Sequence, residues 1–558
     1  MSSVLSVLSV DKDSPMAIYD VIVVGAGAGG GVVAGVLAEA GKRVLLIERG
    51  RSLTFEQVGR DHLRNHRLAH YGHNTGPDLE GNPRVFVDQR GNKHVVQPHH
   101  PGYNNNAAAV GGGTLVYGAQ AWRFLPQDFR MASTYGVPPG SSLADWPISY
   151  EDLAPFYERA EWEIGVAGES DASATIWPRS RPYPMPALPA NAQGRAMRRG
   201  ADALGWPVLT PPLLINTTPY GGRPACIRCQ HCVGFACPVD AKNGTHNTLI
   251  ARALATGRCH LLTGATVERV EVSAAGHVTG VAYIDAEGER RTARAEVVVL
   301  AAGAIETARL LLNSTSARFP HGLGNTHDQV GRHLQGHYYP GVSALMPEPV
   351  HDGLGPGVAT ATVRFNHGND GVVGGGMLAD EFVTLPIIFW KRYLPPDVPR
   401  WGLDAKRFMR EGYRRFVRIT GPVQDIPSPS ARVTLDPQVR DRFGLRVARL
   451  SGTTHPETVR TAAFMFERAR EWLIAAGAER VWGEPPGLGL SAGQHQAGTC
   501  RMGDDPRTSV VDPWCRVHGH DNLYVADASV HVTNGGFNPV LTVMALAFRT
   551  AAHIVGSW

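Results

Sequence analysis

Residues 20–48 read DVIVVGAGAGGGVVAGVLAEAGKRVLLIE, and this stretch decides the fold. Its first five residues, DVIVV, are a β-branched run that is typical of a strand buried on both faces of a parallel sheet. Residues 32–40 predict a helix that ends before Gly41, and RVLLIE predicts a second strand that ends at Glu48. Strand, helix and strand together form one βαβ unit.

The loop between the first strand and the helix carries the pattern G-x-G-x-x-G at Gly25, Gly27 and Gly30. Gly25 permits a tight turn, Gly27 lets the backbone approach a pyrophosphate, and Gly30 lets the helix pack closely on the strand. Free amides at the start of the helix favour phosphate groups, and Glu48 is placed to accept hydrogen bonds from ribose hydroxyls. The unit predicts a dinucleotide cofactor, and it does not by itself separate FAD from NAD.

The composition is that of a globular protein with more than one core. The chain has 558 residues, 43% hydrophobic and 19% charged, which favours two domains. A net charge of +4 requires neither nucleic acid nor an anionic membrane as a partner. MSSVLSVLSVDKDSP lacks the pattern of a signal peptide, and VLTVMALAF is too short to span a bilayer, so we expect no integral membrane protein.

Several further segments follow in a fixed order along the chain. They are AVGGGTLVYGAQAWRF at 109–124, GATVERVEV at 264–272, VVVLAAGAIETARLLL at 297–312, HQAGTCRMG at 495–503 and NLYVADASVHVTNGGFNPVLTVMALAFRTA at 522–551. Together with the N-terminal unit they resemble the glucose–methanol–choline (GMC) oxidoreductase family over nearly the whole chain. DWPISYEDLAPFYERAEWEIGV at 145–166 is similar to the branch with gluconate, fructose and glucose dehydrogenases and glucoside 3-dehydrogenases.

The resemblance implies FAD in an extended, buried pose. We expect the flavin to be non-covalent, because TLVYGAQ at 114–120 lacks the histidine to which some relatives attach it. The resemblance places the Val267 backbone near the adenine, residues 111–114 near the pyrophosphate and flavin, and Asp527 near the ribityl–pyrophosphate region. The expected cofactor-binding residues are Gly25, Gly27, Gly30, Glu48, Gly111, Gly112, Gly113, Thr114, Val267, Asp527, Asn538 and Pro539.

Alcohol oxidation on a flavin needs a base for the hydroxyl proton while a hydride leaves the carbon for flavin N5. A neutral imidazole suits this role near pH 7. The resemblance assigns the base to His495 and implies that Asn538 donates a hydrogen bond to the substrate oxygen. Asn538 also precedes Pro539, where an asparagine can cap a helix. The remaining histidines of this region have no motif context, and we expect structural roles for them: His518, His520 and His531.

Four of the seven cysteines crowd into CIRCQHCVGFACP at 226–238, namely Cys226, Cys229, Cys232 and Cys237. Ferredoxin-type iron–sulfur sites use C-x2-C-x2-C-x3-C-P, and the last spacing here is one residue longer. A zinc site and no metal site are the alternatives. From the similarity to a glucose dehydrogenase of this branch, we expect an iron–sulfur cluster that passes electrons outward singly.

The expected fold class is α/β (α+β): a Rossmann-like FAD-binding domain with a second substrate domain built on an antiparallel sheet. We predict FAD-binding parts at 17–165 and 225–335, an FAD-binding and catalytic segment at 485–558, a substrate-domain or lid segment at 166–224 and the substrate-binding domain at 336–484. Strand-like runs are the candidates for the roof of the substrate pocket: GVSALM at 341–346, TATVRF at 360–365 and ARVTLD at 431–436.

The leading hypothesis is an FAD-dependent sugar dehydrogenase that acts like a glucoside 3-dehydrogenase. The alternatives are a sterol or aliphatic alcohol oxidase of the same family and a non-catalytic flavin electron carrier. The resemblance also implies a small accessory subunit and a cytochrome or other electron acceptor. With such a subunit we expect the protein in the periplasm, and the cytoplasm is the alternative.

Overall fold

The βαβ unit of the sequence lies at the centre of the largest sheet. In a computed structural model of the chain, the structure describes residues 18–558 apart from 59–74, 99, 101–102, 104–106, 382–383, 486, 488 and 491–492. β1 (Ile18–Val24), α1 (Ala28–Glu39) and β2 (Val44–Glu48) follow one another as predicted, and β1 pairs in parallel with β2. The apolar residues of β2 are all buried, as a strand covered on both faces requires.

The large sheet has the order β7-β2-β1-β10-β9-β8, and β18 also pairs with β10. β10 is long enough for its first residues to pair with β9 in an antiparallel hairpin and its last three to pair in parallel with β18. The α/β architecture predicted from the sequence is confirmed. Beyond β1 and β2, its strands are β7 (Cys259–Thr263), β8 (Thr266–Val272), β9 (Val278–Ile284), β10 (Arg290–Leu300) and β18 (Leu523–Val525).

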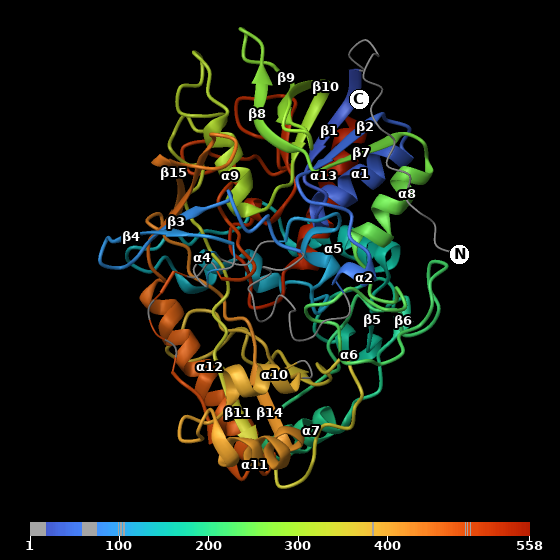
Figure 1. The fold of residues 1–558 in the computed structure, drawn as a ribbon, viewed down its shortest axis with the longest axis vertical. Helices are drawn as coiled ribbons and strands as arrows, with labels where there is room; N and C mark the ends of the chain where they lie inside the picture. The colour runs from blue at the N-terminus through green and yellow to red at the C-terminus, as the bar shows by residue number, and fades with distance from the viewer. Residues whose placement is uncertain are drawn as a thin grey trace.

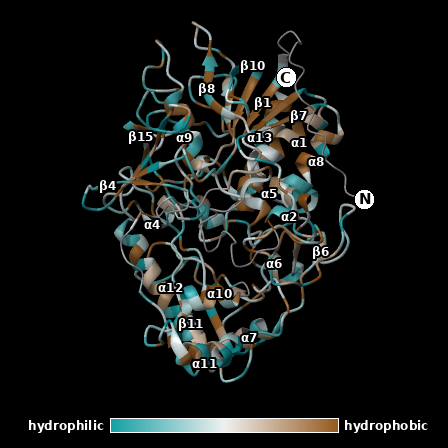
Figure 2. Cartoon of the chain, viewed as in Figure 1, coloured by the Kyte–Doolittle hydropathy of each residue, from teal (hydrophilic) through white to brown (hydrophobic). Residues whose placement is uncertain are grey.

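Helices cover this sheet and bury its apolar strands. α1 packs against α13 (Val540–Gly556) and α8 (Leu249–Ala255), and α13 packs in turn against α5 (Tyr150–Ala160). α9 (Ala304–Asn313) follows β10 and packs against β8. Figure 1 shows these elements gathered at one end of the molecule, and Figure 2 shows hydrophobic residues along β1 and β10.

A second, antiparallel sheet lies at the opposite end of the molecule (Figure 1). Its order is β12-β13-β14-β11-β17, and α12 (Pro456–Ala475) and α7 (Ala192–Leu204) pack beside it. GVSALM forms β11 and TATVRF contributes β12, as the sequence predicts. The strands are β11 (Gly341–Leu345), β12 (Ala361–Thr362), β13 (Leu378–Asp380), β14 (Phe416–Thr420) and β17 (Arg480–Trp482).

The third predicted roof run, ARVTLD, belongs to a different sheet. It forms β15 (Arg432–Arg440), which pairs with β16 (Arg446–Ser451). β16 pairs in parallel with β3 (Arg84–Val87), and β4 (Lys93–Val96) completes this sheet. The expectation of one common roof is therefore wrong for ARVTLD, because alternation predicts a strand without naming its partner. The boundaries between the predicted domain segments stay predictions.

None of the helices within the described ranges is long and apolar enough to cross a bilayer.

The remaining elements lie outside the three larger sheets, and most of them are short. The short elements are α2 (Phe55–Val58), α4 (Met131–Tyr135), β5 (Ala167–Gly168), α6 (Ser170–Ala174), β6 (Met185–Pro186), α10 (Pro386–Ile388) and α11 (Gly402–Gly412).

Candidate active site

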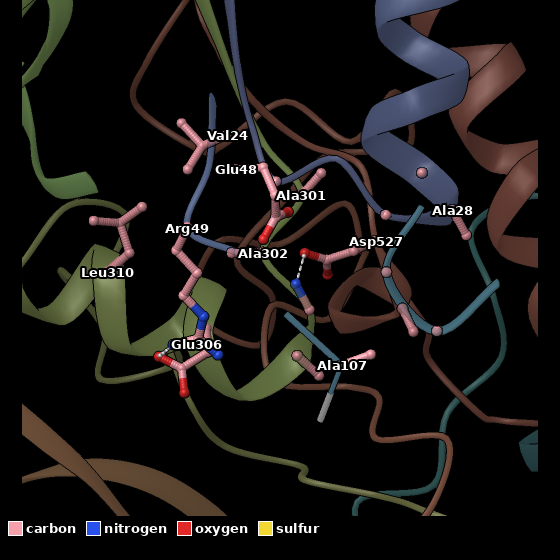
Figure 3. A pocket seen from close by; sticks show the side chains of 18 of the residues that line it. Val24, Ala28, Glu48, Arg49, Ala107, Ala301, Ala302, Glu306, Leu310 and Asp527 are labelled. Carbon is pink, nitrogen blue, oxygen red and sulfur yellow. Dashed lines mark hydrogen bonds and ion pairs between the residues drawn. The ribbon is translucent and has the colours of Figure 1, made fainter. Parts of the chain in front are cut away.

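A long cavity runs past the carboxyl ends of the parallel strands, and we call it the glycine-loop cavity. Its volume is about 350 Å³. The β1–α1 turn, the end of β2 and the β10–α9 turn line it (Figure 3). The start of β8 and the start of α13 line it as well. Ligands of open α/β sheets bind at this edge, outside the carboxyl ends of the strands.

The glycine loop has the geometry that a phosphate needs. Gly25 has a φ of 104°, and a Cβ there would clash with the carbonyl oxygen of Ala301. A Cβ on Gly27 would meet no described atom within 4 Å, because Gly27 faces the cavity. Gly27 is also the N-cap of α1, and no described side chain caps the helix. The first amides of α1 are therefore available to an anion in the cavity.

Two carboxylates are fixed at the cavity wall (Figure 3). Glu48 accepts hydrogen bonds from the backbone amides of Ala26 at 2.9 Å and Gly50 at 2.8 Å, and burial raises the pKa of its carboxyl. Asp527 accepts a hydrogen bond from the amide of Gly303 at 2.9 Å and one from Thr307 Oγ1 at 2.6 Å. A carboxylate oxygen has more than one lone pair, so each group can still accept a hydrogen bond from a ligand hydroxyl.

Most of the residues expected at the cofactor lie on this cavity. They are Gly25, Gly27, Glu48, Gly112, Gly113, Val267, Asp527 and Pro539. Val267 lies at the start of β8, beside Ala265 and Thr266. Gly30 is absent from the described lining, and a Cβ there would clash with the carbonyl oxygen of Gly25, as close helix–strand packing predicts. Gly111 packs against the His246 ring.

A second cavity lies between the glycine loop and the antiparallel sheet, and we call it the roof cavity. Its volume of about 510 Å³ is within the range of small-molecule sites. Thr114 and Asn538 line this cavity, together with Gln120 and residues of β13 and β14. The two cavities meet at shared lining residues, namely Ala28, Gly113, Gln494, His495 and Val540.

His495 lies where the two cavities meet. Its φ of 56° is in the left-handed region, which a non-glycine residue adopts at a cost and which is frequent at functional sites. The backbone carbonyl of His495 accepts a hydrogen bond from Asn534 Nδ2 at 2.7 Å. Its ring nitrogen Nδ1 lies 2.8 Å from Nδ1 of His337 and 3.3 Å from the hydroxyl of Tyr339.

The surroundings of His337 determine which nitrogen of His495 carries the proton. His337 is buried, and its Nε2 faces the carbonyl oxygens of Gly535 at 2.9 Å and Asn534 at 3.2 Å. Carbonyls only accept, so Nε2 of His337 carries hydrogen. Burial lowers the pKa of His337 to about 4, so the ring is neutral and its Nδ1 accepts. His495 must then donate from Nδ1, which leaves a lone pair on Nε2.

His495 is consequently suited to act as a base near neutral pH. Burial holds the pKa of His495 well below its usual value. The imidazole is therefore neutral at pH 7. A base must be unprotonated in the resting enzyme, and this environment provides that state.

Asn538 faces the roof cavity and does not cap α13. Pro539 is the N-cap residue, and no cap hydrogen bond from a described side chain is present there. Nδ2 of Asn538 donates to the Tyr339 hydroxyl at 3.2 Å, and Oδ1 has no partner among the described residues. One N–H and the carbonyl oxygen thus remain for a substrate. A buried polar atom without a partner is costly, so these groups are available to a ligand or a water molecule.

The other histidines singled out by sequence lie away from these cavities. His518 contacts Ser509 Oγ at 2.9 Å, and His520 packs against Phe319. His531 contacts Oδ1 of Asn534 at 3.1 Å. None of these three histidines is among the described lining residues of either cavity.

Sequence reasoning missed several residues of the site. His337 and Tyr339 lie two positions apart just before β11, and Glu381 and Arg418 belong to the β13–β14 region. For His337 and Tyr339, the only local indication of a role in the site was that two aromatic rings come just before a strand. Glu381 and Arg418 are 37 positions apart and meet only through strand pairing.

The four clustered cysteines are not arranged around a common metal position in the structure. Among the described residues, no group of three or more His, Cys, Asp or Glu side chains gathers around a metal position. Lys242 enters the cysteine loop instead, and its Nζ donates to the carbonyls of Cys232 and Phe235 at 2.7 Å. The structure therefore gives no support to an iron–sulfur cluster or a zinc ion.

Similar proteins cover the chain almost from end to end. It is 29% identical to the fructose dehydrogenase large subunit of Gluconobacter japonicus, across 96% of this chain and 97% of that protein. It is 33% identical to the 6'''-hydroxyparomomycin C oxidase of Streptomyces lividus, across 96% and 91%. The crystal structure of pyridoxine 4-oxidase from Mesorbium loti has the same fold, with a TM-score of 0.64 at 20% identity over 96% of this chain and 99% of that one.

Two family models decide the assignment. Both describe GMC oxidoreductases, and they match residues 19–339 and residues 427–547, which together make up most of the chain. The family uses FAD, and its members oxidise alcohol groups. The chain belongs to the GMC oxidoreductase family.

Proposed function

We propose that this enzyme oxidises a secondary or primary hydroxyl of a sugar, in the manner of a glucoside 3-dehydrogenase, with His495 as the base. The observation that carries the proposal is the meeting of the glycine-loop cavity and the roof cavity at His495. A cofactor in the glycine-loop cavity and a substrate in the roof cavity would then both lie next to the His495 imidazole.

FAD fits the donor set of the glycine-loop cavity. The uncapped start of α1 suits a pyrophosphate, and Glu48 suits the hydroxyls of a ribose. Val267 and Asp527 line the same cavity at separate positions along its length. When bound, FAD supplies the acceptor for the hydride of the alcohol carbon.

The residues of the roof cavity supply the proton chemistry. A substrate hydroxyl placed between His495 and Asn538 donates its proton to Nε2 of His495. The amide of Asn538 and the hydroxyl of Tyr339, which bond to each other at 3.2 Å, hold the substrate oxygen in position. The imidazolium that forms keeps its Nδ1–H bonded to His337. Positioned proton transfer of this kind typically contributes about 100- to 10,000-fold to the rate.

Polar groups on the roof cavity favour a sugar over a sterol or aliphatic alcohol. Gln120, Glu381 and Arg418 line the cavity beyond the reacting end. A long apolar substrate would take these polar groups out of contact with water without bonding to them, at a cost in binding free energy. Carbon 3 of a glycoside is the oxidation site that we propose.

We also propose that the enzyme works with an accessory subunit and passes its electrons to a cytochrome or a similar acceptor. The support is that the fructose dehydrogenase relative is itself a large subunit. With such a partner the protein would be exported to the periplasm.

An anaerobic titration tests the proposal. Purified holoenzyme is mixed with methyl β-D-glucopyranoside, and flavin absorbance is followed while the product is identified by NMR. We expect the flavin to bleach and the glycoside to carry a ketone at carbon 3. A flavin that stays oxidised with every sugar but bleaches with sterols or long-chain alcohols would refute the proposal.

A further inference from the structure

The roof sheet presents alternate side chains to the substrate side and to the core. β13 and β14 are antiparallel, with Ala379 opposite Thr420 and Asp380 opposite Ile419. Leu378, Val417 and Ile419 are buried in the cluster beneath α12. The residues in between face the other way, and because side chains alternate along a strand they reach the roof cavity. These residues are Met377, Ala379, Glu381, Arg418 and Thr420.

The same register brings one carboxylate and one guanidinium together on the cavity wall. The amide of Glu381 donates to the carbonyl of Arg418 at 2.9 Å, which continues the pairing of the two strands. Oε2 of Glu381 accepts a hydrogen bond from Nη1 of Arg418 at 2.6 Å. Both side chains are 16% exposed. The guanidinium lies over Gly341 of β11, where a Cβ would clash with it.

We propose that the Glu381–Arg418 pair binds the non-reacting hydroxyls of an uncharged polyhydroxyl substrate and thereby sets the specificity of the enzyme. This inference rests on the proposed function, because it assigns the substrate class of the same site. A hydroxyl both donates and accepts a hydrogen bond. The pair offers it a carboxylate acceptor and guanidinium donors side by side on the roof.

The charges of the cavity wall disfavour ionic substrates. Glu381 and Arg418 neutralise each other, and the same wall carries one further acidic residue, Asp380, and one further basic residue, Arg392. Asp380 accepts hydrogen bonds from the amides of Ala359 and Thr360 and from Gln193. Acidic and basic side chains are therefore balanced in number on this wall, which favours an uncharged substrate over an ionic one. Neutral sugars and polyols are the class that this wall accommodates, in contrast to aminosugars.

Substitutions at the pair provide the test, with a matched control. The variants are Glu381→Gln, Arg418→Lys and the doubly neutral Glu381→Gln/Arg418→Gln, which leaves no unpaired buried charge. Glu479→Gln is the control, because it breaks the exposed Arg415–Glu479 ion pair next to β14 and outside the cavity. FAD content and the flavin spectrum establish that each variant is folded holoenzyme.

The readout is stopped-flow reduction of the flavin without oxygen, which separates the substrate Kd from the rate constant of reduction. The probes are methyl β-D-glucopyranoside, D-glucosamine and the small alcohol 2-methyl-1,2-propanediol. We expect Kd for the glucoside to rise about tenfold to a hundredfold in each pair variant, since hydrogen bonds to charged groups are involved. The reduction rate constant should change less than about threefold, and Kd for the small diol should not change. Glu479→Gln should match the wild type.

Distinct results overturn the inference. The inference is wrong if the double variant binds the glucoside as tightly as the wild type does. It is also wrong if the wild type binds D-glucosamine more tightly than the glucoside. A wild-type flavin that is bleached by the small diol and by no sugar overturns the substrate class and leaves alcohol oxidation intact. A flavin that no alcohol bleaches refutes the proposed function as well.

Discussion

Replacing His337 by phenylalanine should slow alcohol oxidation while FAD stays bound. His337 is not among the described lining residues of either cavity, so it acts through His495. Its Nδ1 accepts the Nδ1–H of His495 at 2.8 Å, and this bond keeps the lone pair of His495 on Nε2. Phenylalanine retains a ring of similar size but has no acceptor. The His495 proton can then move to Nε2, where it blocks the base.

The structure gives the size of the expected effect. A buried donor that loses its acceptor costs about 1–3 kcal/mol. At about 1.4 kcal/mol per tenfold, the rate constant of flavin reduction should fall about 5- to 150-fold. The Tyr339 hydroxyl at 3.3 Å can take over part of this bond, which favours the lower half of that range. His337→Asn places an amide oxygen near the former Nδ1 and should restore most of the rate.

Stopped-flow flavin reduction across a pH series measures both effects. In His337→Phe the acid limb should not move to higher pH, because neutral His337 accepts from the Nδ1–H of His495 and so favours the protonated ring. His351→Phe is the control, since His351 packs against Tyr413 outside the described lining of both cavities. The reasoning fails if flavin-loaded His337→Phe reacts within about twofold of the wild type, or if His337→Asn is as slow as His337→Phe.

Three further predictions concern other groups. Because the pKa of His495 is lowered, kcat/KM should stay level down to about pH 6.5 and fall at lower pH as the imidazole is protonated; a pH–rate profile with its acid limb above pH 7 would contradict this. Burial raises the pKa of Asp380 to about 7. The protonated Asp380 carboxyl therefore stabilises the fold at pH 4, and the free energy of unfolding should fall by up to about 4 kcal/mol as the pH rises through 7. Urea unfolding between pH 4 and 8 should show this loss, and Asp380→Asn should remove it; an equal pH dependence in both proteins would argue against it. Lys242→Met leaves the carbonyls of Cys232 and Phe235 without their donor, so the free energy of unfolding should fall by about 3 kcal/mol. In the wild type, iron should be substoichiometric to flavin. Stoichiometric iron would reverse our interpretation of the cysteine loop.

The sequence predicted the parts of the fold whose patterns are local. The βαβ unit shows its strand, turn and helix within residues 20–48, and β8 and the β10–α9 unit are equally self-contained. The two predicted catalytic positions, His495 and Asn538, both line the roof cavity. Short motifs around these two residues resemble those of the GMC family, and this resemblance is what singled them out.

Other features depend on contacts between distant segments and carry no local pattern. β15 has the alternation expected of a strand, but its partner β16 and the link to β3 follow from long-range pairing. His337 becomes informative only when its ring is placed between two carbonyls and His495. The cysteine spacing predicted a metal site, and spacing alone does not show how the four thiols are placed relative to one another.

The central claim is that the His495 imidazole takes the substrate proton at the junction of the two cavities. Its most direct test is the rate of anaerobic flavin reduction by methyl β-D-glucopyranoside in His495→Ala, compared with the wild type at equal FAD content. We predict that the variant keeps its flavin and is reduced about 100- to 10,000-fold more slowly. A variant reduced within about tenfold of the wild-type rate would contradict the account.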